Sequence, residues 1–291
     1  MKKFMMIAAL AAMIIPFASC GKRDVNNPSQ GPKATIARAE NAGNAKKVEI
    51  SDEKTDIKSI EFTDGGRYII TMEVTKATEI VYITGTYTVS GNTYTLDGFG
   101  TVTVSEDGSS VEINGSTGEG DTIAVTVSCT TTEAPADVDE FTRDICHAWR
   151  VDKVDISINM NGTSVGVIDD KDPSNIPALA EKLIKQAKEQ GFDLDMNLEP
   201  IKGMQIVYID FSSQKTLTIK FKDHADYVGT ISNVNGYDFH YDLEGNVGSS
   251  IINGSADCNF HPDTDKTATL KISATVNDYK GRVIFNLTKI D

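Results

Sequence analysis

The sequence has few of the residues from which catalytic and metal-binding sites are built. It contains four histidines and four cysteines among 291 residues. No histidine has a second histidine at a metal-ligand spacing, and no two cysteines form the Cys-x-x-Cys pattern of a structural zinc site. The Gly-x-Ser-x-Gly motif of many hydrolases and a glycine-rich phosphate loop are both missing. The sequence therefore predicts no catalytic residue, no metal ligand and no cofactor, which favours a non-enzymatic protein.

Basic residues are also scarce. Lys and Arg number 28 against 42 Asp and Glu, which gives a net charge of −14, and the basic residues are nowhere clustered. A protein that follows a phosphate backbone needs such a cluster, so nucleic acid is not expected as a partner. An acidic surface mainly favours solubility and disfavours binding to anionic membranes.

The beginning of the chain is typical of a secretory signal. Lys2 and Lys3 are followed by an apolar run over residues 4–17. This run is shorter than the roughly 20 residues that a membrane-spanning helix needs, so we interpret residues 1–19 as a signal peptide and not as part of the fold.

The four residues at the end of this run, Phe-Ala-Ser-Cys (17–20), resemble a bacterial lipobox, in which the cysteine is acylated after cleavage. We therefore expect Cys20 to be the lipid attachment site and the acyl chains to be the contact with the membrane. The expected location is the cell envelope, as an outer-membrane lipoprotein in the periplasmic or the surface-exposed leaflet. The alternative is ordinary signal cleavage near Ala18, with Cys20 as a bystander.

Two aperiodic stretches divide the rest of the chain. Residues 20–47 are rich in Asn, Ala, Gly, Pro and Lys, a composition that is typical of a flexible tether. The second stretch, TTTEAPADVDE at 130–140, carries the only proline between Pro32 and Pro173. The predicted parts are a signal peptide at 1–19, a lipidated tether at 20–47, an N-terminal β module at 48–131, a linker at 132–140 and a C-terminal β-barrel with a helix at 141–291.

From Lys47 onward, apolar residues recur with a period of two. In TVTVSEDGSSVEING (101–115), Val102 and Val104 are expected to face Val111 and Ile113 across a turn. Alternation between turn signals indicates antiparallel strands with one buried face, and many short strands of this kind favour a sandwich or a barrel.

One segment of the second half has a helical period. Ser174 or Asn175 can serve as its N-cap, Pro177 fits the first turn, and Gly191 fits the C-terminal end. The sequence therefore predicts one inserted helix over about residues 174–190. Its apolar stripe consists of Ile176, Leu179, Ala180, Leu183, Ile184 and Ala187.

The two halves of the chain resemble each other. YITGTYTVSGNTYTLDG (82–98) and YVGTISNVNGYDFHYDLEG (227–245) both run from Tyr through Gly-Thr and a hairpin turn to an aromatic strand. Upstream, SIEFTDGGRYIIT matches VYIDFSSQKTLTIKF as strand, turn and strand. A repeat of this length predicts two copies of one β-meander unit.

Together these features resemble the lipocalin-like or calycin-like lipoproteins of Bacteroidetes. The resemblance covers most of residues 57–291. It implies a mainly β fold of two antiparallel β-barrel or half-barrel modules, with room for an internal cavity, although a fold does not fix a ligand. The residues that carry it are the lipobox, the tether, ICHAWRVDKV around Trp149, IEFTDGGRYI (60–69) and GTYTVSGNTYTL (85–96).

The stretch YDFHYDLEG (237–245) looks like a metal or acid–base site, but strand parity divides it. Phe239 and Tyr241 fall on one face, whereas His240 and its acidic neighbours fall on the other. We interpret the polar half as the solvent side of an amphipathic strand that begins at the Asn-Gly turn. The remaining histidines, His147, His224 and His261, are interpreted as solvated loop residues.

Large apolar side chains are expected on the inner face of the second module. They either line a pocket for a small hydrophobic ligand or fill the core, and an aromatic content of 7% favours filling. The candidate cavity residues are Trp149, Leu217, Ile219, Phe221, Tyr237, Phe239, Tyr241 and Phe285.

We therefore expect a lipid-anchored envelope protein with a non-enzymatic binding role, whose partners are the membrane and a small hydrophobic ligand or a glycan. One alternative is a carbohydrate-binding accessory lipoprotein, which would need exposed aromatic platforms and has only one tryptophan. The other is a hydrolase with residues gathered from several loops, for which no motif is present.

Overall fold

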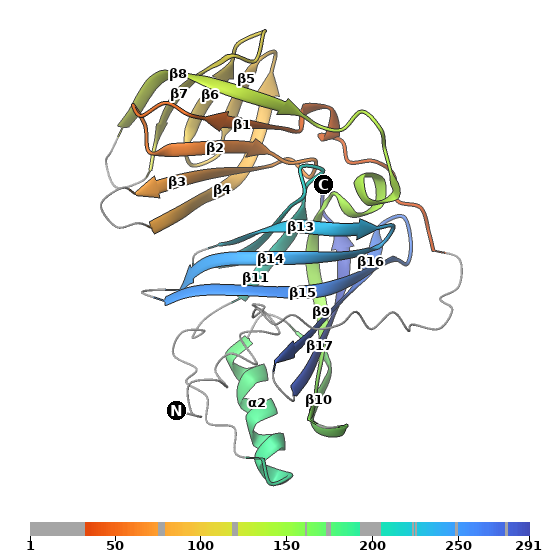
Figure 1. Cartoon of the computed structure of the whole chain (residues 1–291). Helices are drawn as coiled ribbons and strands as arrows, with labels where there is room; N and C mark the ends of the chain where they lie inside the picture. Colours follow the sequence, from red (N-terminus) through yellow and green to blue (C-terminus); the bar gives the residue numbers. More distant parts are fainter. Residues whose placement is uncertain are drawn as a thin grey trace.

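The computed structural model describes residues 33–291 except 75–78, 118–121, 161, 173–175, 193–204, 223, 225, 248–249 and 277–278. The predicted signal peptide, Cys20 and the two candidate N-caps lie outside the described residues. The described chain is mainly β and folds as two antiparallel barrels (Figure 1), which confirms the predicted fold class. None of its described helices is both long and apolar enough to cross a membrane.

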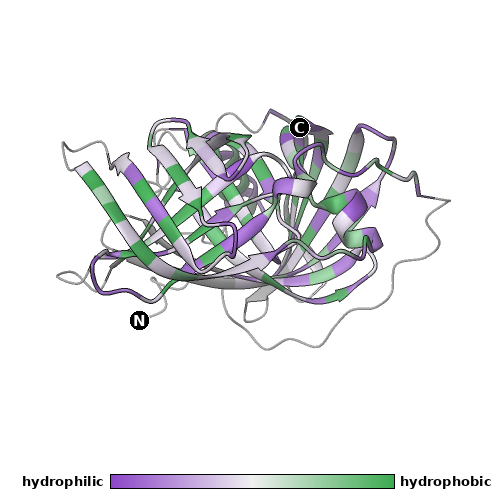
Figure 2. Cartoon of the chain, turned by 90° about the horizontal axis from the view of Figure 1, so that it is seen from above, coloured by the Kyte–Doolittle hydropathy of each residue, from purple (hydrophilic) through white to green (hydrophobic). Residues whose placement is uncertain are grey.

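The first barrel is closed because β1 pairs with both β2 and β8. The predicted facing residues are confirmed, since Val102 pairs with Ile113 and Val104 with Val111. Hydrophobic and hydrophilic residues alternate along the strands, as Figure 2 shows. The strands are β1 (Lys46–Ile50), β2 (Ile57–Phe62), β3 (Arg67–Val74), β4 (Glu79–Ser90), β5 (Thr93–Leu96), β6 (Gly100–Val104), β7 (Ser110–Ser116) and β8 (Thr122–Glu133).

The second barrel is closed by β9, which pairs with β17 along its length. On its other edge β9 has two partners in turn, because it pairs first with β11 and then with β10. The strands are β9 (Ala148–Met160), β10 (Thr163–Lys171), β11 (Gln205–Phe211), β12 (Thr216–Lys222), β13 (Tyr227–Asn235), β14 (Asp238–Val247), β15 (Ser250–Pro262), β16 (Thr267–Val276) and β17 (Tyr279–Lys289).

The predicted helix is confirmed as α2 (Ile176–Glu189), which packs against β10. The side chain of Gln186 accepts a hydrogen bond at 2.9 Å from the backbone N–H of Val167, which ties the helix to the strand. Gly191 adopts a φ of 84° just after the helix, a conformation that favours glycine. The buried side chains of α2 are Ile176, Leu179, Ala180, Leu183 and Ala187.

The described part of the predicted tether, residues 33–45, differs from the expectation. Ile36 is fully buried, and its N–H donates to Oδ1 of Asp144 at 3.0 Å. Ala34 N–H donates to the carbonyl of Pro262 at 3.1 Å. The chain therefore packs on the second barrel before it enters the first. Ile36 is the one large apolar side chain among the buried residues of this segment, and the others are Ala39, Ala42 and Ala45, which is why composition did not predict this contact.

The strand pairing places the two halves of the chain in the same register. Glu61 pairs with Ile69 across β2 and β3, and Asp210 pairs with Thr218 across β11 and β12. The next strand of each half continues this match. Gly85 of β4 pairs with Tyr68 of β3, and Gly229 of β13 pairs with Leu217 of β12. The repeat seen in the sequence is thus also a structural repeat.

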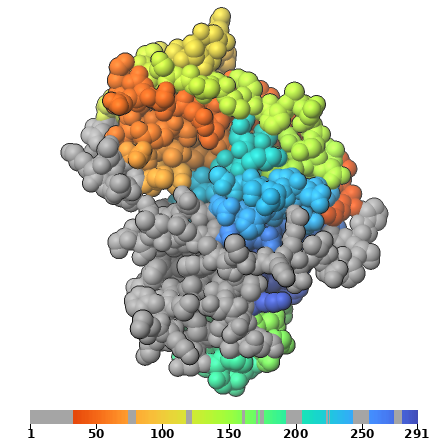
Figure 3. Space-filling view, viewed as in Figure 1, coloured from red at the N-terminus to blue at the C-terminus, as the bar shows by residue number. Residues whose placement is uncertain are grey.

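The two barrels pack against each other through these equivalent hairpins, and atoms of the first barrel meet those of β11 to β13 directly (Figures 1 and 3). Thr216 Oγ1 donates to Oε2 of Glu61 at 2.8 Å, and the N–H of Ser213 donates to Oδ2 of Asp64 at 2.7 Å. In both of these bonds the β11–β12 hairpin donates and the β2–β3 hairpin accepts.

Candidate functional site in the second barrel

The predicted cavity residues gather inside the second barrel, with one exception. They belong to a single buried cluster that also includes residues of α2 and β10. Their burial is compatible both with a filled core and with a lined cavity. The members are Trp149, Leu217, Ile219, Phe221, Phe239, Tyr241 and Phe285.

The exception is Tyr237, which lies in the turn before β14 and is partly exposed. Its hydroxyl donates to Oδ2 of Asp144 at 2.5 Å, and its ring lies 4.1 Å from the Lys33 ammonium. Burial and the hydrogen bond to Asp144 raise the pKa of Tyr237 to about 12. Tyr237 thus contacts the N-terminal segment. The two-residue period predicted that Tyr237 belongs to the inner face of the strand, but Tyr237 lies in the turn before β14, where the alternation of the strand does not apply.

Aromatic rings close one end of the barrel. The short π-helix η2 (Phe141–Ile145) lies there, and the indole N–H of Trp149 donates to the carbonyl of Ile145 at 3.0 Å. The ring centroids of Trp149 and Phe260 are 5.2 Å apart, and those of Phe211 and Phe239 are 5.8 Å apart. Such edge-to-face contacts add stability beyond the buried area. We call Phe141, Trp149, Phe211, Phe239 and Phe260 the aromatic plug.

The expectation of a solvated loop was wrong for His147, which is fully buried beside this plug. Its Nδ1 lies 2.9 Å from both carboxylate oxygens of Asp291, and its Nε2 lies 3.1 Å from the carbonyl of Arg143. A buried imidazole is stable only when both nitrogens have partners. Asp291 is far away in the sequence, so no local pattern could indicate this arrangement.

Two tyrosine hydroxyls inside the second barrel lack partners among the described residues. Tyr227 and Tyr241 are 0% and 1% exposed, and neither hydroxyl makes a hydrogen bond there. Burial raises the pKa of both, so both are neutral donors. The Tyr227 ring packs against Phe221 at 4.9 Å. A buried hydroxyl without a partner costs about 1–3 kcal/mol, so the pair calls for a water or a ligand.

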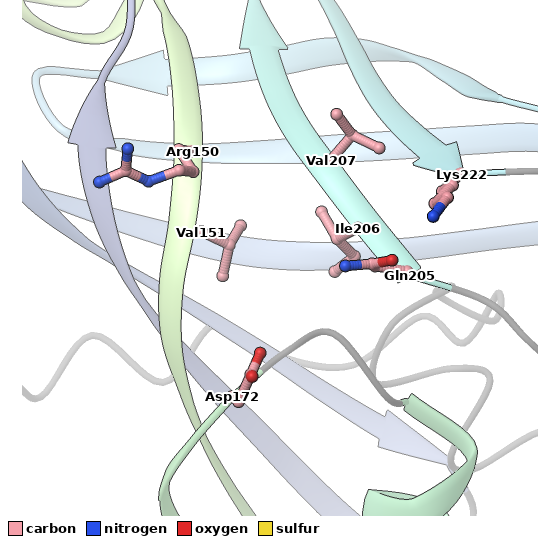
Figure 4. A pocket seen from close by; sticks show the side chains of 7 residues that line it. All are labelled: Arg150, Val151, Asp172, Gln205, Ile206, Val207 and Lys222. Carbon is pink, nitrogen blue, oxygen red and sulfur yellow. The ribbon is translucent and has the colours of Figure 1, made fainter.

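The wall of the second barrel opens where β9 changes partners. Pairing with β11 ends at Trp149, and pairing with β10 begins at Val154. A pocket of about 370 Å³ lies in this gap, which we call the fork pocket (Figure 4). It is lined by Arg150, Val151, Asp172, Gln205, Ile206, Val207 and Lys222.

Carboxyl groups are buried between the two barrels. Glu61, Asp64 and Asp210 are 4%, 0% and 1% exposed, and within the described part of the chain neither carboxyl oxygen of Asp210 has a hydrogen-bond partner. Burial raises the pKa of all three, most strongly for Asp210. Arg67 opposes this effect at Asp210 through its positive charge. In the part of the chain that the structure describes, no group of three His, Cys, Asp or Glu side chains could hold a metal ion.

Neither the fork pocket nor the buried carboxyls were predicted. The pocket depends on one strand having two partners on the same edge, which no residue pattern indicates. The carboxyls did leave a signal, because the matched segments SIEFTDGGRYIIT and VYIDFSSQKTLTIKF place Glu61 and Asp210 at the same point of the repeat.

The fold therefore defines a two-barrel β protein with a candidate binding interior in its second barrel. No protein-family model matches the chain, and no curated protein matches it in sequence. Among solved structures, transferrin-binding protein B from Neisseria meningitidis is similar over 93% of this chain and 46% of its own, with 11% identity and a TM-score of 0.28. A double mutant of transferrin-binding protein B from Haemophilus parasuis is similar over 84% of this chain and 44% of its own, with 8% identity and a TM-score of 0.27.

The chain thus spans less than half the length of these structures. Scores this low do not establish a common fold, and the two-barrel architecture is defined by the strand pairing itself.

Proposed function

We propose that this protein is a lipid-anchored, non-enzymatic binding protein of the cell envelope whose second barrel takes a small hydrophobic ligand. Cys20 would hold the acyl anchor, and the lipocalin-like lipoproteins that the sequence resembles are its proposed class. The candidate lining residues named above supply an apolar interior, which is the usual surrounding of a small-molecule site.

One contrast between the barrels carries this proposal. In the first barrel the hydroxyls of Tyr68, Tyr87 and Tyr94 all donate to carbonyl oxygens, at 2.8, 3.1 and 3.3 Å. In the second barrel the hydroxyls of Tyr227 and Tyr241 have no partner among the described residues. Polar groups in an apolar interior can orient a ligand in such a pocket.

The alternative is a carbohydrate-binding protein that stacks sugar rings on an exposed aromatic surface. The position of the tryptophan does not support it. Trp149, the only tryptophan of the chain, is 0% exposed and belongs to the aromatic plug. It is therefore not an exposed platform for a glycan.

Replacing Tyr241 with phenylalanine tests the contrast directly. In protein stripped of bound lipid, Tyr241→Phe should leave the free energy of unfolding unchanged or raise it by up to about 1–3 kcal/mol, because it removes a hydroxyl without a partner. The matched control Tyr68→Phe should lower it by about 1 kcal/mol, because the carbonyl of Asp97 loses its donor. Urea unfolding followed by circular dichroism measures both. If Tyr241→Phe lowers the free energy of unfolding as much as Tyr68→Phe does, the Tyr241 hydroxyl has a hydrogen-bond partner in the empty barrel. The proposal then loses its basis.

The anchor is tested by Cys20→Ala in the full-length protein expressed in its host. We expect the wild-type protein to sediment with membranes and the variant to stay in the soluble envelope fraction, because stable anchoring needs two or more acyl chains. Cys258→Ala, which changes a free buried thiol of the second barrel, is the control and should still sediment. A Cys20→Ala variant that remains with the membranes contradicts lipid attachment at this residue.

A further inference from the structure

Buried polar atoms without partners concentrate between the two barrels. Nine buried side-chain oxygen and nitrogen atoms have no hydrogen-bond partner among the described residues. Two of them are the hydroxyls of Tyr227 and Tyr241, and the other seven lie where the barrels meet. We call the residues that carry these seven atoms the seam. They are Glu61, Asp64 and Arg67 of the first barrel and Asp210, Ser213 and Thr218 of the second.

Three carboxyl groups are buried in the seam. Oδ1 of Asp210 lies so near the backbone of Gly65 that a Cβ atom on this glycine would come within 2.3 Å of it. The N–H of Ser213 donates to Oδ2 of Asp64, but Oδ1 of Asp64 and Oε1 of Glu61 have no partner among the described residues. An ionised carboxylate in such a place is costly, because neither water nor a donor stabilises the charge on these oxygens.

The cations beside the seam are engaged elsewhere. Nη1 of Arg67 donates to the carbonyl of Gly65 at 2.9 Å, and its guanidinium carbon lies 5.0 Å from the ring centroid of Tyr208. Burial raises the pKa of Tyr208, so this ring is neutral. Lys220 pairs with Asp226 at 2.8 Å. These cations therefore do not neutralise three negative charges in the seam.

Protonation makes the seam carboxyls neutral. Burial raises the pKa of all three, most strongly for Asp210. Neighbouring positive charges oppose this rise, and the charge of Asp291 adds to it at Asp210. The seam is therefore neutral at acid pH and acquires negative charge as the pH rises. Its charged neighbours are Arg38, Lys47, Arg67, Lys220, Asp226 and Asp291.

Each barrel keeps its own core if the seam opens. Every described strand pairing stays within one barrel, and the buried apolar residues form two separate clusters. The chain enters the first barrel at β1 and leaves it after β8 (Figure 1). Hydrogen bonds across the seam are polar contacts such as the one from Nζ of Lys220 to Oγ1 of Thr84 at 3.2 Å. Opening therefore breaks polar contacts and leaves the strand pairing intact.

We propose that the seam is a pH-sensitive hinge, closed while the carboxyls of Glu61, Asp64 and Asp210 are protonated and opened when they ionise. The closed form binds more protons than the open form. Its stabilisation is therefore complete below the ordinary pKa of a carboxyl, about 4, and is lost as the pH rises through the raised pKa of the closed form. Between these limits each pH unit favours opening about tenfold per carboxyl. The hinge goes beyond the proposed function, because it requires no ligand in the second barrel.

The test is hydrogen–deuterium exchange of the full-length protein at pH 5 and pH 8, measured by mass spectrometry and corrected for the intrinsic pH dependence of exchange. The N–H of Ser213, which donates to Asp64 across the seam, reports opening. The amides of the β14–β15 pairing report the integrity of the second barrel. Two variants accompany the wild type. Glu61→Gln/Asp64→Asn/Asp210→Asn makes the seam permanently neutral, and the control Glu112→Gln changes an exposed carboxyl of β7, outside the seam.

We expect the protection of the Ser213 amide in the wild type to fall at least about tenfold from pH 5 to pH 8, while the β14–β15 amides stay within about twofold. Glu112→Gln should follow the wild type, and the triple variant should be equally protected at both pH values. The hinge is wrong if the wild-type Ser213 amide is equally protected at both pH values, or if β14–β15 loses protection to the same degree. A triple variant that opens with pH like the wild type also overturns it. The first two outcomes need only the wild type, so they decide the question if the triple variant does not fold.

Discussion

Replacing Gly65 with alanine should lower the free energy of unfolding by about 3 kcal/mol, the upper part of the range for overpacking a tight contact. Gly65 lies in the β2–β3 turn where the two barrels meet. A Cβ atom there would stand 2.7 Å from the backbone nitrogen of Ala148 and closer still to Oδ1 of Asp210. Neither neighbour can yield easily, because one is backbone at the start of β9 and the other is a fully buried side chain.

The matched control is Gly43→Ala, because a Cβ on Gly43 meets no atom within 4 Å. This variant should remain within about 0.5 kcal/mol of the wild type. Urea unfolding can be followed in the second barrel alone, because Trp149 is the only tryptophan of the chain. Equal effects of the two substitutions would contradict the tight packing of the barrels at Gly65.

Replacing Asp210 with asparagine should change how stability depends on pH. Asp210 is 1% exposed, and burial raises its pKa well above the ordinary range of an aspartate. Between the ordinary value of about 3.9 and the raised native value, the folded protein keeps a proton that the unfolded chain has lost. Stability from this group is therefore complete at acid pH and decreases as the pH rises through that window.

The neutral amide of Asp210→Asn avoids the buried charge at high pH. We expect the variant to match the wild type near pH 4 and to be more stable at pH 8, by about 1.4 kcal/mol for each unit by which the native pKa exceeds the ordinary value. Some pH dependence should remain, because burial also raises the pKa of Glu61 and Asp64. Urea unfolding across this pH range measures the difference, and an unchanged pH profile contradicts a raised pKa of the buried Asp210 carboxyl.

Asp107 provides a control of opposite sign. Hydrogen bonds from Ser105 and Ser109 lower the pKa of this exposed aspartate to about 2. Its contribution is present above the ordinary pKa and is lost as the pH falls toward 2. Asp107→Asn should therefore lower stability at neutral pH, and the difference should disappear on acidification.

The repeating pattern of apolar residues was sufficient to predict the fold class, the helix and the facing residues of the β6–β7 hairpin. These features depend on local periodicity, so a linear sequence contains them. The inward placement of Phe239 and Tyr241 was predicted in the same way and agrees with their burial. The pattern became misleading at chain turns, as it did for Tyr237.

Features that depend on contacts between distant segments could not be predicted. His147 is buried because Asp291 reaches it, and Ile36 because Asp144 accepts its N–H. The fork pocket exists because β9 has two successive neighbours on one edge. A residue pattern describes which face a side chain takes, but it does not describe which segment will lie against that face.

Ligand binding by the second barrel is tested most directly by native mass spectrometry of the full-length protein purified from its own host. We predict a complex heavier than the lipidated polypeptide by the mass of one small molecule, and extraction with organic solvent should remove that mass and yield a hydrophobic compound. A folded protein that shows only the mass of the lipidated polypeptide before and after extraction would contradict the proposal that this barrel carries a ligand.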